Sequence, residues 1–311
     1  MPLVPMSRLL SHAQRHRYAV GYFEAWNMES ILAVKDAAEE ADSPVILGFN
    51  GGFLSNPKRR IEENVFHYGS LGRAVADQAK VPVALILNEA DQVPLLIKGL
   101  HAGFNVIMHD HQTCSHEEAL AINQYLARTA HAMDAEVEAE IGELPVLDLK
   151  TESLSPGRKT DPQLAASFVE QTGIDALAVA VGNVHMLEGR KASLDLQLIH
   201  ELRRRVKVPL VLHGGTGIES ASLKEAIQAG ISKINVGTLL RRAFMNALRK
   251  YFEEHELKSL DPGEATSTGG RQDMLTAARQ AVAAEVRKLM ELFGSAGMAS
   301  RFDSEAVKDR K

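Results

Sequence analysis

Short apolar runs recur along the chain every few tens of residues, and each is followed by turn residues and then by a segment of helical period. Most are continuous stretches of β-branched residues and leucine without polar alternation, as in parallel strands that are buried on both faces. Eight such units in a row, joined by right-handed connections, are most economically closed as an α/β barrel of the (β/α)8 or TIM type, with a doubly wound sheet as the lesser alternative. The runs begin at Ala19, Pro44, Pro82, Asn105, Glu136, Ala176, Pro209 and Lys233.

The segments between the runs carry helix signals. Asp161 precedes Pro162 as an N-cap before a proline in the first turn, and Gly173 ends the same segment. A further helix is expected over residues 271–292, beyond the eighth strand, leaning on the barrel or on a partner subunit. We therefore expect one barrel domain over residues 1–311, with an N-terminal helix and a C-terminal helical extension.

Residues 142–160, after the fifth run, have no helical period. A loop of this length inside a compact domain often serves as an active-site lid. The alternative is a solvated surface loop with no role in the reaction.

The composition of the chain excludes several classes of protein. The 311 residues are 45% hydrophobic and 24% charged, which excludes disordered and collagen-like chains, and a net charge of −5 argues against a nucleic-acid surface. Cys114 is the single cysteine, so an intrachain disulfide and a thiolate metal cluster are excluded. Residues 1–20 contain neither a signal-peptide core nor a membrane span. We expect a cytoplasmic protein that acts on a small molecule and binds neither membrane nor nucleic acid.

In a barrel of this kind the loops after the strands form the active face, so polar residues at the ends of the apolar runs are the candidates for chemistry. A lone histidine at such a position is more often structural than a ligand. His185 and His213 differ because they end adjacent predicted strands and can converge, and neutral imidazole is the commonest ligand of zinc. The other candidates are Glu24, Asn88, Glu89, His109, Asp110, His111, Glu140 and Asn235.

Five segments carry a resemblance to a known family. VAVGNVH to His185, LVLHGGTG to Gly217, KINVGT to Thr238, VEAEIG to Gly142 and ELFGSAGMA to Ala299 resemble class II fructose-bisphosphate and tagatose-bisphosphate aldolases. The resemblance implies that His185 and His213 bind zinc and that Glu140 can hold the metal in an alternative position. It also implies that the phosphate and enediolate of dihydroxyacetone phosphate are held by Gly214, Gly215, Thr216, Asn235 and Thr238.

The HGGTG turn supports this on physical grounds, since a glycine-rich strand-to-helix turn presents backbone N–H groups and a helix N-terminus to an anion. Taken alone, the motif is equally compatible with an ordinary tight turn. We expect Gly215→Val to abolish substrate binding while leaving the fold intact.

The chain departs from the family at four places. Asn88 and Glu89 replace the family's Asp-His pair after strand three, and Glu24 replaces an asparagine after strand one. His109 replaces an aspartate after strand four, and GELPVLD replaces the lid after strand five. New metal-competent residues indicate a re-tuned site rather than a decayed one. We expect His185, His213 and Glu89 to bind the metal, with Zn²⁺ as the leading occupant and Mn²⁺, Co²⁺ or Mg²⁺ as alternatives.

The implied reaction is reversible aldol cleavage of a phosphorylated ketose by a metal-dependent lyase of carbohydrate metabolism, working as a homodimer or homotetramer. Lys233 is expected to start its strand at the wrong face for a Schiff base. The carboxylate lost at Asn88 reappears at Glu24, the leading candidate base, with Asp110 or His111 in reserve. Glu24 as an additional metal ligand or a supporting residue is the alternative. The rival functions are a catalytically silent sugar-phosphate-binding barrel and an isomerase or epimerase that uses the same enediolate.

Overall fold

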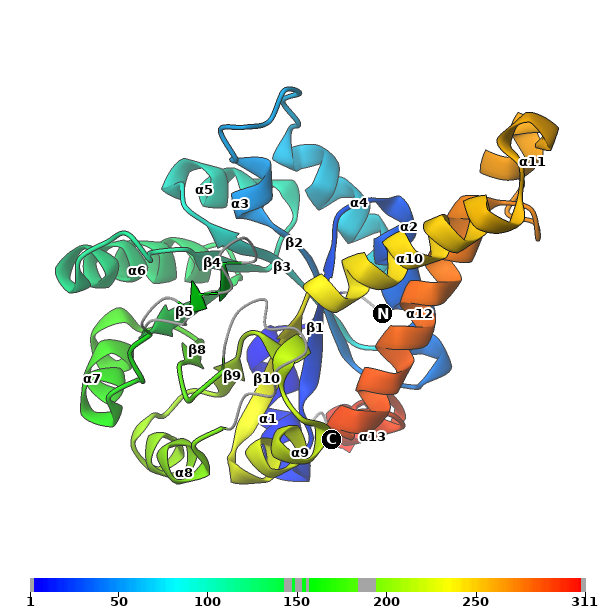
Figure 1. Cartoon of the computed structure of the whole chain (residues 1–311). Coiled ribbons are helices and arrows are strands. Elements are labelled where there is room, and N and C mark those ends of the chain that lie inside the picture. Colours follow the sequence, from blue (N-terminus) through cyan, green and yellow to red (C-terminus); the bar gives the residue numbers. More distant parts are fainter. Residues whose placement is uncertain (1–2, 143–146, 149–152, 155–156, 184–193, 309–311) are drawn as a thin grey trace.

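In the computed structural model, which describes residues 3–142, 147–148, 153–154, 157–183 and 194–308, eight parallel strands form a closed barrel (Figure 1). Their order around the barrel is β1-β10-β9-β8-β5-β4-β3-β2. The (β/α)8 prediction is therefore confirmed, and the doubly wound alternative is wrong. The strands are β1 (Val20–Ala25), β2 (Val45–Asn50), β3 (Val83–Ala90), β4 (Val106–His109), β5 (Glu136–Ile141), β8 (Ala176–Val179), β9 (Leu210–Leu212) and β10 (Ile231–Val236).

A helix follows each barrel strand and covers the outside of the sheet. The helix predicted from its caps is present as α7, where the Asp161 side chain accepts a hydrogen bond from the backbone N–H of Leu164 and Gly173 adopts the left-handed φ of 71°. The outer helices are α2 (Met28–Glu40), α4 (Val65–Gln78), α5 (Val93–Ala102), α6 (His116–His131), α7 (Pro162–Thr172), α8 (Leu196–Arg205), α9 (Ser220–Ala229) and α10 (Thr238–Glu254); a short α3 (Gly51–Leu54) follows β2.

The interior of the barrel is apolar at the end where the strands begin. Tyr22, Ile46 and Ile86 belong to a buried cluster there, together with Leu9 and Leu10 of α1 (Met6–His16). Helix α1 therefore closes the N-terminal end of the barrel, and the polar inward-facing residues lie above this layer, towards the carboxyl ends of the strands.

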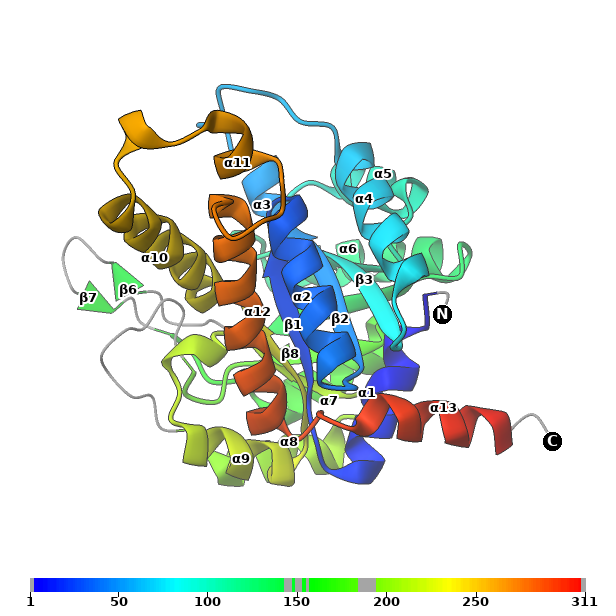
Figure 2. The same cartoon turned by 90° about the vertical axis from the view of Figure 1, so that its right-hand side faces the viewer.

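The C-terminal helices pack against the outside of the same barrel. Helix α12 (Met274–Phe293) lies along α2 and α10, and the Phe293 ring stacks on Phe23 of β1 with the ring centroids 6.3 Å apart (Figure 2). The helix expected over residues 271–292 is thus present and leans on its own barrel. The other helices of the C-terminal region are η2 (Leu257–Ser259), α11 (Pro262–Thr266) and α13 (Met298–Lys308). No helix within the described ranges is long and apolar enough to cross a membrane.

The segment 142–160 contains a short antiparallel hairpin, β6 (Leu147–Asp148) and β7 (Ser153–Leu154). Thr160 ties its far end to the barrel, because the Thr160 hydroxyl donates to the Ile141 carbonyl (2.6 Å) and accepts from the Ala180 N–H (2.8 Å). Both ends of the segment therefore meet at the tops of β5 and β8. Its role as a lid stays a prediction.

Candidate active site

The side chain of His213 lies at the centre of the polar layer, directly after β9, and is 1% exposed. Its Nε2 lies 3.1 Å from Oε1 of Glu138, while its Nδ1 lies 3.3 Å from Oε1 of Glu89 and 3.8 Å from Oε2 of Glu140. Strands β3 and β5 therefore bring three carboxylates onto one imidazole, including those of the predicted ligands Glu89 and Glu140. The fourth predicted ligand, His185, lies outside the described residues.

Glu138 and Lys233 hold this imidazole from below. The Lys233 ammonium donates to Oε2 of Glu138 at 2.6 Å, and both side chains are fully buried. Burial opposes the charge of each group and lowers the pKa of Lys233, whereas Lys233 and His213 hold the pKa of Glu138 below its usual value. The expectation that Lys233 starts its strand is wrong: β10 begins at Ile231, and Lys233 lies inside it.

The partnership of Glu138 with Lys233 joins two strands that are distant in the sequence. The alternation in EVEAEI places Glu138 on the same face of β5 as Glu140, and this pattern could have identified it as a second inward carboxylate. No local pattern shows that Lys233, on a strand nearly a hundred residues later, supplies the compensating charge.

Glu89 reaches His213 through an irregularity in β3. Its φ is 50°, in the left-handed region that non-glycine residues rarely adopt, and the pairing of β3 with β4 shifts between Leu87 and Ala90. The alternation of the strand is broken there, and the carboxylate turns inward, where the Asn50 amide donates to it at 2.8 Å. Strained backbone of this kind is typical of functional sites.

The charge balance of the layer favours a cation at Nδ1 of His213. Burial raises the pKa of Glu140 to about 7. Burial also opposes a charge on His213, but its bonds to Glu138 and Glu89 raise the pKa of the imidazole to about 10. A carboxylate that accepts one imidazole N–H and leaves the other nitrogen facing acidic oxygens is the usual support of a metal-binding histidine. The donor set fits a divalent metal ion.

Glu24 ends the inward face of β1 and is paired with Arg241 of α10. The guanidinium donates through Nε (3.0 Å) and Nη2 (2.5 Å) to one carboxylate oxygen. Burial raises the pKa of Glu24 despite the opposing charge of Arg241.

A cavity of about 390 Å³ opens beside Arg241, at the ends of β1 and β2. Aromatic rings and three cationic side chains line it, and the guanidinium of Arg241 lies 4.7 Å from the ring centre of Trp26 and 4.6 Å from that of Phe53. The other cations are Lys58 and Arg59, in the loop after α3.

Asn88 and Asn235 complete the polar layer. Asn88 is 1% and Asn235 8% exposed, and the side-chain oxygens of both have no hydrogen-bond partner within the described part of the chain. Buried amide oxygens are normally satisfied, so these two indicate a place for a ligand or water.

The predicted phosphate turns lie next to each other, because β9 and β10 are paired. Gly214 adopts the left-handed φ of 69°, and η1 (Gly215–Gly217), which includes Thr216, follows it. Thr238 is the first residue of α10, so its first-turn N–H groups face the same side.

Gly215 corrects one expectation. A Cβ at this position would lie 2.7 Å from Cγ2 of the buried Ile234. Gly215→Val would therefore disturb the packing between β9 and β10, and it cannot test phosphate binding with the fold intact.

Asp110 and His111 line a second cavity of about 400 Å³, which also touches Glu140. The ring nitrogens of His111 face two backbone carbonyls, that of His109 at 3.3 Å and that of Glu140 at 2.6 Å. The Asp110 carboxylate is engaged less tightly, by the N–H of Gln112 at 3.1 Å. Of the two alternatives to Glu24 as the base, Asp110 is therefore better placed than His111.

A profile of the family described as fructose-bisphosphate aldolase class-II matches residues 4–298. The chain belongs to this class II aldolase family. The match covers every barrel strand and the residues around His213, and it makes this protein an aldolase-type lyase.

Individual relatives of this aldolase agree with the family. YdjI of Escherichia coli K12 is 36% identical over 238 residues, or 76% of this chain and 84% of that protein. The crystal structure described as the YdjI aldolase superposes with a TM-score of 0.79 at 32% identity, covering 96% of this chain and 99% of the other. A protein assigned as a fructose-1,6-biphosphate aldolase from Coccidioides immitis gives 0.77 at 27% identity, over 94% and 96% of the two chains.

Removing Lys233 should expose the dependence of the barrel on its buried charge pair. Lys233→Met is expected to lower the free energy of unfolding of this aldolase by about 3–5 kcal/mol, because Glu138 loses its buried counter-charge. Lys233→Met combined with Glu138→Gln should recover most of that loss. Urea unfolding measures the free energy of unfolding of both variants. Equal destabilisation of the single and double variants would contradict a buried charge pair between Lys233 and Glu138.

Proposed function

We propose that this aldolase reversibly cleaves a phosphorylated ketose to dihydroxyacetone phosphate and an aldehyde, with a divalent metal ion held by His213, Glu89 and His185. Glu140 would hold the metal in an alternative position. The observation that carries the proposal is the surrounding of His213, with Glu138 on Nε2 and two carboxylates at Nδ1. Zn²⁺ is the expected ion, with Mn²⁺, Co²⁺ or Mg²⁺ as alternatives, because one carboxylate replaces a family histidine.

The chemistry needs one base and one place for the charge that bond cleavage leaves behind. Glu24 takes the proton of the hydroxyl next to the scissile bond, that hydroxyl carbon becomes the aldehyde, and the bonding electrons pass to the dihydroxyacetone phosphate half as an enediolate. A proton from solvent then adds to the enediolate carbon and completes that product, and Glu24 returns its proton to solvent. A metal held by His213, Glu89 and His185 would supply Lewis acidity to the reaction. Asn88 and Asn235 place their amides beside the same polar layer.

Two further parts of the site are assigned on geometry. The adjacent turns at Gly214–Gly217 and Thr238 would bind the phosphate through backbone N–H groups and the start of α10. The cavity beside Arg241 would take the aldehyde half, since it lies next to Glu24. A homodimer or homotetramer stays a prediction.

An isomerase or epimerase would form the same enediolate but would release no aldehyde. A silent sugar-phosphate binder would form no enediolate and release no aldehyde. Purified protein supplied with metal should exchange a dihydroxyacetone phosphate C–H proton into deuterated water and, with ketose phosphate, release an aldehyde that a dehydrogenase traps. Exchange without an aldehyde across a panel of ketose phosphates would favour the isomerase.

Metal content tests the ligand set. His213→Ala and Glu89→Ala should each lower the bound metal by one equivalent per chain, and Glu138→Gln should weaken its affinity by about 10- to 100-fold, because it orients the ligating imidazole. Elemental analysis after dialysis measures this, with the exposed His101→Ala as control. Full metal content in both alanine variants would move the site elsewhere, with His109 and His111 next to be tested.

Phosphate binding is tested at the first residue of α10. Thr238→Asp places a negative charge where the phosphate dianion should bind, while an acidic residue in the first turn leaves the helix stable. Thr238→Asn is the uncharged control of the same shape. Calorimetry should show that Thr238→Asp binds dihydroxyacetone phosphate about 10-fold or more weakly than Thr238→Asn does. A tenfold change in Kd corresponds to about 1.4 kcal/mol of binding free energy. Equal affinities would remove this turn from the site.

The base is tested by Glu24→Gln. General acid–base catalysis contributes about 10²- to 10⁴-fold, so kcat should fall by that factor while the metal content stays unchanged. Asp110→Asn is the matched comparison and should retain far more activity. Near-normal turnover of Glu24→Gln defeats the assignment, and loss of its metal would make Glu24 a ligand instead.

A further inference from the structure

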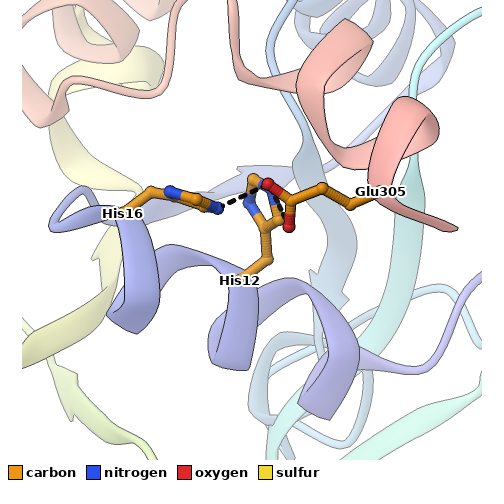
Figure 3. Close-up of side chains that lie close together, drawn as sticks. All are labelled: His12, His16 and Glu305. Carbon is orange, nitrogen blue, oxygen red and sulfur yellow. Dashed lines mark ion pairs between the residues drawn. The ribbon is translucent and has the colours of Figure 1, made fainter. Parts of the chain in front are cut away.

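A cluster of three potential metal ligands lies at the opposite end of the barrel from His213. His12 and His16 are one turn apart on α1, and Glu305 belongs to α13 (Figure 3). One ligand atom from each residue lies within 4.8 Å of the other two. Residues four apart on a helix share a face, the spacing by which two histidines commonly bind zinc.

The geometry of the cluster is that of a three-ligand site. Oε1 of Glu305 lies 2.9 Å from Nε2 of His16, and Oε2 lies 3.6 Å from Nε2 of His12. The two imidazole rings are 4.3 Å apart at their centres and tilted by 55°, so both Nε2 atoms point towards the carboxylate (Figure 3).

His12 is held as metal-binding histidines usually are. Its Nδ1 lies 2.9 Å from the hydroxyl of Tyr18, an outer partner that fixes the ring and leaves Nε2 directed at Glu305. The side chain is 1% exposed, and Nε2 has no hydrogen-bond partner within the described part of the chain. A buried imidazole nitrogen without a hydrogen-bond partner, aimed at a histidine and a carboxylate, indicates a place for a ligand.

The surroundings allow a cation to enter. A cavity of about 170 Å³ borders His12 and Glu305 and gives room for a water ligand in the fourth position. Arg15 and Arg301 also approach Glu305, at 3.4 and 3.5 Å, but their side chains are 60% and 53% exposed and can turn to solvent. Three protein ligands with one open position suit zinc or a neighbouring divalent metal.

We propose that His12, His16 and Glu305 form a second divalent-metal site, of the zinc class, which fastens α13 to α1 at the N-terminal end of the barrel. This site is separate from the metal site proposed at His213, and its test does not depend on that assignment. Its role is structural, because α1 fills the bottom of the barrel and the metal would add to the packing of Phe302 of α13 against His12 and the apolar residues of α1.

The stoichiometry of bound zinc tests the site on the full chain. Glu305→Gln and His16→Gln lie at the rim and should each lose one zinc per chain, while His213→Ala retains this zinc. Arg15→Gln is the matched control: it removes a competing cation next to Glu305 and should bind zinc at least as tightly as the unaltered protein. Unchanged zinc content in Glu305→Gln would overturn the proposal.

Two measurements separate a metal site from an ion pair. Zinc should raise the Tm of the His213→Ala protein by a few degrees, and this rise should disappear in His213→Ala combined with Glu305→Gln. Tyr18→Phe should weaken zinc binding about 10- to 100-fold without removing any ligand. If Glu305→Gln lowers Tm equally with and without zinc, the cluster is an ion pair only and the proposal is wrong.

Discussion

The buried chain from Lys233 through Glu138 to His213 is the constraint on which the upper half of this barrel depends. It crosses the interior from β10 to β5 and β9, and every member is fully or almost fully buried. Charges placed there are tolerated only when each has a partner, because desolvation of an isolated ion costs several kcal/mol. Lys233 offsets one of the three acidic groups, and the other two, Glu89 and Glu140, face Nδ1 of His213.

The irregular end of β3 follows from the same constraint. A regular strand would direct Glu89 outwards, to the helices, where a carboxylate has no partner. The left-handed φ at Glu89 and the shifted pairing with β4 return it to the interior, where Asn50 and His213 receive it. Backbone strain is thus located where an additional carboxylate contributes to the site.

Much of this arrangement could be predicted from the sequence, for reasons that particular residues make clear. Buried parallel strands are continuous apolar runs, so the barrel and the inward position of Glu24 and His213 follow from local pattern. Glu138 and Lys233 were missed because their pairing depends on barrel closure, which brings together residues far apart in sequence. The close packing of Gly215 on Ile234 was missed for the same reason, and the third segment of the predicted metal site, around His185, lies outside the described residues.

Thr160 has a consequence for how this barrel can diversify. Its hydroxyl joins the tops of β5 and β8, so the chain leaves and re-enters the barrel at nearly one point. Because the two anchors are already held together, a change in the length of the connection between them adds little loop-closure entropy and imposes no force on the strands. The length of the connection between Ile141 and Thr160 can therefore change while His213 and its carboxylates stay where they are.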